Sequence, residues 1–68
     1  MKNRAKLLCQ KYGIDTPKIY ALRVGITEEL AKEIWDETAV IPNDVITRSC
    51  EIFNCSDAYF LCMCERVN

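Results

Sequence analysis

Apolar residues recur along most of this 68-residue chain at the spacing of an amphipathic helix. In the first segment a single apolar face, with the i, i+3, i+4, i+7 pattern, is formed by Ala5, Leu8, Cys9 and Tyr12. Gly13 follows them in the position of a left-handed helix cap. Punctuation of this kind, rather than the turn signals of a hairpin, separates one apolar segment from the next. The pattern therefore predicts a series of short helices.

The second and third predicted helices are separated by a short turn that contains glycine. Residues 15–17 read Asp-Thr-Pro, an N-cap candidate followed by proline at the first helical position. The helix that starts there ends at Gly25 and carries Ile19, Tyr20, Leu22 and Val24. Thr27 is predicted to cap a third helix over residues 28–36, whose first-turn glutamates suit the positive end of the helix dipole. Its apolar positions, opposite a charged face, are Leu30, Ala31, Ile34 and, beside them, Trp35.

Two more helices are predicted after a loop that closes with Pro42. Asn43 is expected to cap the fourth helix and Asn54 to end it. The inward positions of this helix are Val45, Ile46, Ser49, Cys50, Ile52 and Phe53. Ser56 is expected to cap a short last helix that holds Tyr59, Phe60, Cys62 and Met63. The chain is thus predicted to be all-α, a compact bundle of about five short helices in a single domain over residues 1–68.

The junction between the second and third predicted helices has the form of a helix-turn-helix unit. It consists of a helix of roughly eight residues, a glycine-containing turn of three or four residues, and a second helix. In DNA-binding proteins such a unit presents its second helix to the major groove.

Composition and charge narrow the classes of protein. Hydrophobic residues make up 50% of the chain, which is enough for one core. No apolar run approaches the roughly 20 residues that span a bilayer, so no membrane association is expected. The net charge of −1 hides an asymmetry. Residues 1–23 carry six cations against one acid, a net +5, whereas residues 24–68 carry three cations against nine acids, a net −6.

The cysteines indicate neither a disulfide framework nor a metal site. Their number is odd, no secretory signal precedes them, and they stand at positions 9, 50, 55, 62 and 64. Their spacing lacks the paired C-x2-C of zinc modules, and the chain contains no histidine. Cys9, Cys50 and Cys55 are therefore expected to be structural, and a reducing cytoplasm is the expected location.

An enzyme is not expected, and no cofactor is. The chain has no histidine, no G-x-S-x-G motif and no glycine-rich phosphate loop. Its many carboxylates are interpreted as a solvated helix face rather than as a general acid and base.

A series of residues between positions 7 and 61 matches the order of motifs in a known family. The matching residues are Gly25-Ile26-Thr27, Ala31, Ile34-Trp35-Asp36, Val40-Ile41-Pro42, Val45, Ile46, Cys50, Ile52, Asn54-Cys55-Ser56 and Leu61. In these residues the chain resembles the Cro/cI-type (XRE-like) helix-turn-helix repressors, in particular the short single-domain members of bacteria and phages. The stretch from Pro42 to Ser56 is the most specific part of the resemblance.

The resemblance implies a sequence-specific transcriptional regulator, a repressor, that binds double-stranded DNA as a homodimer with helix 28–36 in the major groove. The residues that would read base edges are Thr27, Glu28, Glu29 and Lys32. Those that would contact phosphate are Lys18, Arg23, Thr38 and Asn43. Flanking phosphates lie within reach of Lys2, Arg4, Lys6 and Lys11. In the last helix, dimer contacts are expected from Tyr59, Phe60 and Met63, which exceed what so small a core can hide.

The charge of the predicted reading helix leaves other interpretations open. Its single cation, Lys32, is surrounded by Glu28, Glu29, Glu33, Asp36 and Glu37, and the sequence pI is near 5.3. Affinity for DNA rests largely on neutralised phosphates. The alternative is a helix-turn-helix fold reused as a protein-interaction module through the acidic helix 28–37, with weak or no DNA binding. A thiol-based redox or metal protein is the third interpretation, which native-state thiol titration would separate from the others.

Overall fold

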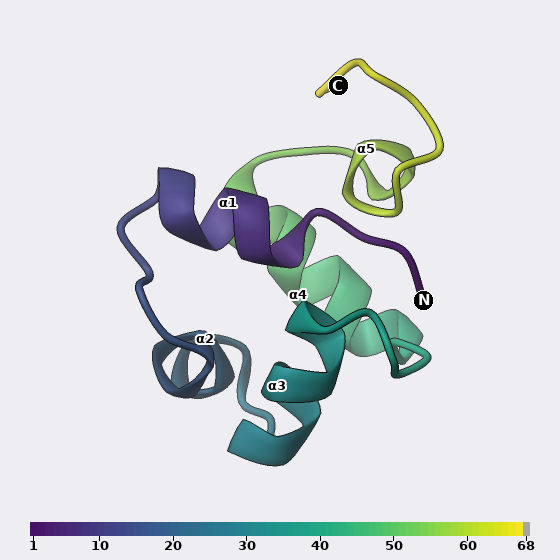
Figure 1. Ribbon diagram of the computed structural model, residues 1–68. Coiled ribbons are helices and arrows are strands. Elements are labelled where there is room, and N and C mark those ends of the chain that lie inside the picture. The colour runs from purple at the N-terminus through teal and green to yellow at the C-terminus, as the bar shows by residue number, and fades with distance from the viewer. Residues whose placement is uncertain (68) are drawn as a thin grey trace.

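Five α helices follow one another along residues 1–67, the part of the chain that the computed structural model describes (Figure 1). They are α1 (Ala5–Lys11), α2 (Pro17–Val24), α3 (Glu28–Trp35), α4 (Asn43–Phe53) and α5 (Asp57–Phe60). No strand occurs in these residues, which confirms the predicted all-α class. The helices form one compact body with extents of 28 × 23 × 18 Å.

Most helix ends lie where the capping residues predict. The hydroxyl of Thr16 accepts a hydrogen bond from the Ile19 amide at 3.3 Å, and that of Ser56 accepts one from the Tyr59 amide at 3.1 Å. The C-terminal caps of α2 and α4 are left-handed, at Gly25 (φ 75°) and Asn54 (φ 51°). These boundaries arise from local backbone chemistry, so they are visible in the sequence.

Two predicted helix ends are wrong. Asn43 is the first residue of α4 rather than its cap, and its side chain makes no capping bond because Pro42 already occupies the extended N-cap position. The last helix ends at Phe60, and the Met63 amide donates to the Ala58 carbonyl at 2.7 Å across a left-handed Cys62 (φ 60°). Cys62 and Met63 therefore lie in the turn that ends α5, not in the helix.

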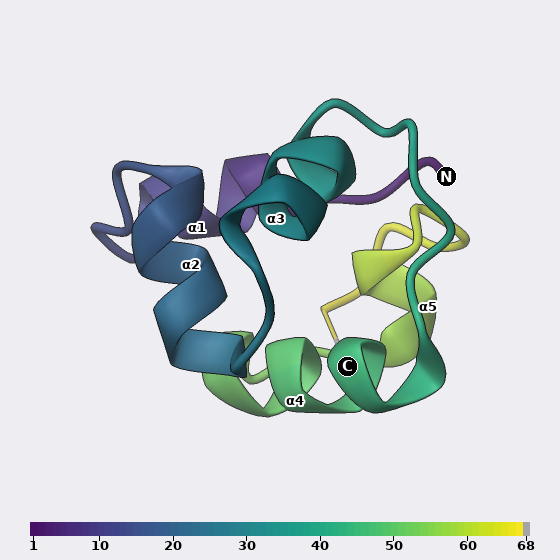
Figure 2. The same cartoon turned by 90° about the horizontal axis from the view of Figure 1, so that it is seen from below.

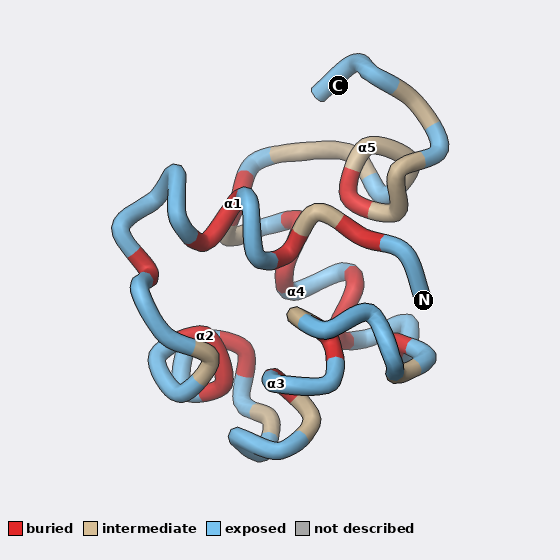
Figure 3. Tube along the Cα trace, in the orientation of Figure 1, coloured by how far each residue is buried: buried red, intermediate tan, exposed pale blue. Residues whose placement is uncertain are grey.

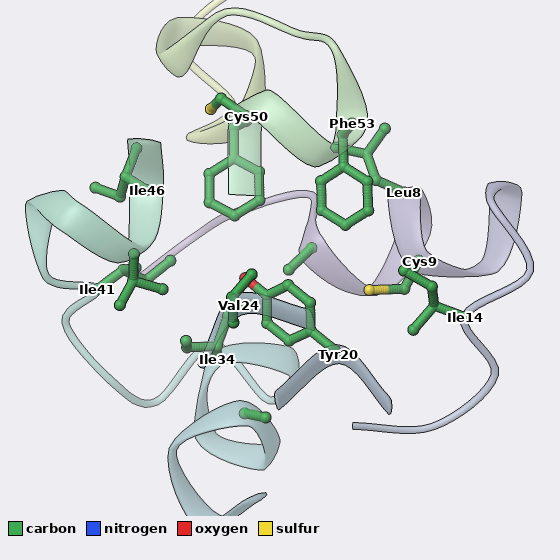
Figure 4. Packing of buried hydrophobic residues seen from close by; sticks show 14 of the residues in the cluster. Leu8, Cys9, Ile14, Tyr20, Val24, Ile34, Ile41, Ile46, Cys50 and Phe53 are labelled. Carbon is green, nitrogen blue, oxygen red and sulfur yellow. The ribbon is translucent and has the colours of Figure 1, made fainter. Parts of the chain in front are cut away.

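The core lies between all five helices and has a row of three aromatic rings at its centre. Phe53 stacks on Tyr20 and on Phe60, with ring centroids 6.2 and 6.3 Å apart. The Tyr20 hydroxyl shares a 2.6 Å hydrogen bond with the hydroxyl of Ser49, so neither buried oxygen lacks a partner. Other apolar side chains surround the rings, among them Leu8, Cys9 and Ile34 (Figure 4). Along α1 to α4 the buried residues recur at intervals of three or four, and exposed residues lie between them (Figure 3).

Tyr12 closes the core from outside, which differs from its predicted place on the buried face of the first helix. Its side chain is exposed, but its ring lies 5.6 Å from that of Phe53 and its hydroxyl donates to the Phe53 carbonyl at 2.9 Å. A large side chain with a polar tip can cover apolar surface in this way while its hydroxyl stays near water.

The helices are arranged so that α2 and α3 share the most extensive helix–helix contact of the fold. α4 also contacts α5, and smaller contacts join α1 to α3 and α2 to α4. Figure 2 shows α2 and α5 at opposite sides of the molecule, with α4 running between them. Within residues 1–67 no helix has both the length and the apolar character needed to cross a membrane.

Candidate nucleic-acid interface

The turn between α2 and α3 is short and tightly packed. It comprises residues 25–27, and its geometry depends on Gly25, whose φ of 75° lies in the left-handed region that glycine adopts without strain. The amides of Gly25 and Ile26 both donate to the Ala21 carbonyl, at 2.8 and 3.0 Å. A Cβ at Gly25 would lie 3.2 Å from Nη1 of Arg48, so a larger residue meets both strain and crowding.

The residues predicted to read bases lie together at the start of α3. Thr27, Glu28, Glu29 and Lys32 are all exposed. The Oγ1 atom of Thr27 accepts from the Leu30 amide at 3.1 Å, as a helix cap does, which leaves its O–H as a donor. The ammonium of Lys32 lies 3.5 Å from Oε2 of Glu28, one turn away on α3. Lys32 is thus partly neutralised by its own helix.

The residues predicted to contact phosphate come from three segments of the surface. Lys18 and Arg23 are exposed on α2, and none of the ion pairs formed among residues 1–67 involves them. Thr38 is exposed beyond the end of α3, where its hydroxyl donates to the Glu33 carbonyl at 3.3 Å. Asn43 is exposed at the first position of α4. All four residues are exposed, so each is accessible to a partner at the surface.

The outward face of α3 is strongly acidic in space as well as in sequence. The exposed carboxylates on it and at its end are Glu28, Glu29, Glu33, Asp36 and Glu37. Only Lys32 opposes them on this helix, and it already pairs with one. A face of this sign repels phosphate and attracts cationic groups at distances up to about the Debye length.

Arg4, which the sequence placed among the phosphate-contacting cations, is used inside the protein. Its guanidinium lies 4.2 Å from the centroid of the Tyr59 ring, donates to the Tyr59 carbonyl, and donates to the Cys64 carbonyl at 3.2 Å. It also pairs with Glu65 at 3.3 Å, and its side chain is only 14% exposed. This expectation is therefore wrong, because α5 and the segment after it take up the donors that would meet phosphate.

The three residues predicted to form a dimer contact differ in how far they are buried. Phe60 is 0% exposed and belongs to the core, so the prediction that it lies in a subunit contact is wrong. Tyr59 is half-buried beneath the Arg4 guanidinium, whereas Met63 is 74% exposed. Tyr59 belongs to α5 and Met63 follows it in the chain. α5 lies on the side of the molecule away from α2. A contact there would leave the α2–α3 surface free.

The cysteines are free thiols, and the buried ones are protonated at neutral pH. Burial raises the pKa of Cys9 to about 12. Burial also raises the pKa of Cys50, with a further contribution from the neighbouring Asp57, and that of Cys55. Within residues 1–67 no three metal-ligating side chains gather, and no pocket opens.

The side chain of Asn3 forms a buried polar bracket between α1 and the far end of α3, which the sequence did not predict. Asn3 is only 8% exposed. Its Nδ2 atom donates to the Ile34 carbonyl at 3.0 Å, and its Oδ1 atom accepts from the Ala5 amide at 2.9 Å. Asn3 therefore joins the start of α1 to the last turn of α3. An asparagine before a helix predicts the contact with α1. Nothing in the sequence indicates its contact with α3, 31 residues away.

Comparison with protein-family models, curated proteins and solved structures finds no match to this chain.

Proposed function

We propose that this protein is a sequence-specific DNA-binding transcriptional regulator of the Cro/cI (XRE-like) helix-turn-helix type, a repressor that acts as a homodimer. The observation that carries the proposal is the α2–turn–α3 unit. Two eight-residue helices, joined by residues 25–27, pack closely on each other and leave Thr27, Glu28 and Glu29 at the start of α3 exposed. A helix-turn-helix needs this arrangement, since the first helix braces the second while the second enters the groove.

In this proposal the side chains on the first turns of α3 read the bases. Thr27 offers its O–H, Lys32 donates to guanine, and a glutamate accepts from cytosine N4. Lys18 and Arg23 on α2 and Thr38 and Asn43 beyond α3 position the helix through the phosphates. The exposure of all these side chains supports the assignment.

A second candidate function is supported by the charge of α3. Its carboxylates are exposed and its one cation is paired with Glu28, so the helix offers phosphate little attraction. A cationic protein partner would be drawn to the same surface. In this case the protein is an interaction module that uses the helix-turn-helix fold without reading DNA.

Selection from random duplex DNA at about 50 and about 200 mM salt separates the two candidates. A DNA-binding regulator enriches a short motif and loses affinity steeply at the higher salt concentration, because released counterions drive phosphate contacts. Absence of enrichment together with salt-insensitive behaviour contradicts the DNA-binding proposal and favours the interaction module.

Point variants test which residues of α3 recognise the bases. Lys32→Ala should weaken binding to the selected site. Glu28→Ala should relax base preference at one position by about 1–3 kcal/mol, and should also release Lys32 from its ion pair. Glu51→Ala removes one exposed carboxylate from α4 and serves as the control matched in charge. If Lys32→Ala and Glu28→Ala both bind like wild type, α3 is not the reading helix.

A further inference from the structure

The side of α2 that faces away from the core has an unusual composition. At about 100° per residue, Lys18, Ile19, Leu22 and Arg23 fall within one sector of roughly 140°. We call these four residues the outer face of α2. On the opposite side of the same helix Tyr20, Ala21 and Val24 are buried in the core. The outer face is therefore turned to solvent along the whole helix.

Apolar side chains form the middle of this outer face. Leu22 is 76% exposed and Ile19 is 39% exposed. α3 and α4 expose no large hydrophobic side chain, and α1 exposes one, Leu7. Two adjacent exposed aliphatic groups on one short helix thus distinguish α2 as a surface that gains by being covered.

Cations flank the apolar middle on both sides. By helical position the order around the face is Lys18, Leu22, Ile19, Arg23. Both cations are exposed, and the ion pairs formed among residues 1–67 use Arg4, Lys32 and Arg48 instead. The protein therefore leaves both charges available for acidic groups that come from outside.

We propose that the outer face of α2 docks an acidic amphipathic segment of another protein. Such a segment covers Leu22 and Ile19 with apolar side chains and pairs carboxylates with Lys18 and Arg23. This arrangement satisfies both halves of the face, since apolar contact provides affinity and the opposite charges set orientation and encounter rate.

Two other occupants fit this face less well. A second copy docked α2 against α2 would bring four cations into one contact without a counter-charge. The acidic face of α3 from a second copy carries carboxylates but no exposed large apolar side chain to cover Leu22. DNA would satisfy Lys18 and Arg23 through its phosphates but leave the aliphatic pair against a charged backbone.

The docking surface does not depend on the proposed DNA-binding function, but the two share Lys18 and Arg23. An acidic partner on α2 and a DNA phosphate backbone therefore compete for the same cations. A partner of this kind acts as a competitor of DNA, which supplies a means of regulation to a domain in which no ligand pocket opens among residues 1–67.

The test is an NMR titration of the isotope-labelled protein with three synthetic helical peptides. The probe peptide carries leucines at i and i+4 flanked by glutamates. One control peptide has serine in place of the leucines, and the other has lysine in place of the glutamates. We expect saturable binding of the probe peptide, with amide shifts concentrated in residues 18–25, and at least about tenfold weaker binding of both controls.

Variants assign the contact and separate it from DNA binding. Leu22→Ser should weaken binding of the probe peptide about tenfold and leave DNA binding unchanged, because Leu22 has no part in the phosphate contacts. Charge reversal in the double variant Lys18→Glu and Arg23→Glu should abolish peptide binding. Leu7→Ser, at another exposed leucine (on α1), should bind the peptide like wild type.

Three results would overturn the proposal. The first is no binding of the probe peptide up to about 1 mM. The second is equal binding of the probe and the serine control peptide. The third is a set of shifts that lies outside α2. None of these results depends on the outcome of the DNA selection. The Leu22→Ser variant keeps the two tests apart, because it should weaken peptide binding and leave DNA binding unchanged.

Discussion

Cys9 and Cys50 lie inside the core, Cys9 beside Trp35 and Cys50 on the inner side of α4. Their thiols have the surroundings of small hydrophobic side chains, and burial shifts both pKa values upward. The thiolate is the reactive form of cysteine, so these two residues are poor nucleophiles at neutral pH. Burial likewise raises the pKa of Tyr20 to about 12, although its hydrogen bond with Ser49 acts in the opposite direction. The folded protein therefore favours the neutral forms of Cys9, Cys50 and Tyr20 over their charged forms.

Stability should therefore fall in alkaline solution. Below pH about 9 the Cys9 thiol is protonated in both states, and its contribution to the free energy of unfolding is complete. Between pH about 9 and about 12 the unfolded chain releases this proton while the folded chain retains it. Urea unfolding in the presence of reductant should show stability falling over this window, by up to about 1.4 kcal/mol per pH unit for each such group. Cys9→Ala should make the decline shallower, and an identical slope in both proteins would contradict this account.

The individual helices depend on contacts at their ends, and α3 shows this most clearly. Its first turn is capped by Thr27, a contact within five residues of sequence. At its other end Glu37 adopts a left-handed conformation (φ 63°), and the Thr38 amide donates to the Glu33 carbonyl at 2.9 Å. Glycine is usual at such a position. Here Oε1 of Glu37 accepts from the Asn3 amide at 3.4 Å, which links the strained residue to the bracket at Asn3.

Removal of the Asn3 bracket should destabilise the protein by about 1–3 kcal/mol, because it leaves the buried Ala5 amide without a partner and removes the hydrogen bond to the Ile34 carbonyl of α3. Asn3→Ala loses both contacts. Asn3→Asp keeps an oxygen that accepts from the Ala5 amide but can donate neither to the Ile34 carbonyl nor to the Met1 carbonyl, and it adds a negative charge near Glu37. We expect chemical unfolding at pH 7 to show that both variants are destabilised. A stability of Asn3→Asp equal to wild type would mean that the α3 contact contributes nothing.

The whole molecule separates two surfaces. The α2–α3 surface lies at one end, with the cationic, apolar outer face of α2 next to the acidic face of α3. Exposed Met63 and half-buried Tyr59 lie at the α5 end. Arg4 ties the residues after α5 to the rest of the fold through Tyr59 and Cys64. In the proposed homodimer, a contact at the α5 end would leave the α2–α3 surface accessible.

If the homodimer proposed above uses the α5 end, Met63→Glu should give a monomer in sedimentation experiments. In this variant a carboxylate replaces an exposed apolar side chain, and its burial in an apolar contact costs free energy. Met63→Glu leaves the Arg4–Tyr59 contact intact, which Tyr59→Glu would not, because Tyr59 lies under the guanidinium. Leu7→Glu, at an exposed leucine of α1, is the control and should remain dimeric. A wild-type protein that is monomeric at every concentration would refute the dimer.

The sequence by itself determined the helical class and most helix boundaries. Thr16, Gly25, Thr27, Asn54 and Ser56 act through hydrogen bonds or backbone preferences that span five residues or fewer, so their effect can be read locally. It also determined that α3 has an acidic outer face, because helical spacing assigns each residue to a side. The error at Asn43 arose because Pro42 itself takes the N-cap position, and the error at Cys62 arose because a left-handed residue ends α5 early.

Only the tertiary structure decided which of several equivalent side chains are buried. Ile19, Leu22 and Tyr20 are all apolar, yet only Tyr20 finds Phe53 and Ser49 in the core. Arg4 and Lys18 are both cations, yet only Arg4 meets the carbonyls of the segment after α5. Asn3 and Phe60 likewise acquire their roles from residues far away in the chain. Local preference decides where a helix begins, whereas burial depends on how the helices pack together, and that information is distributed over the whole chain.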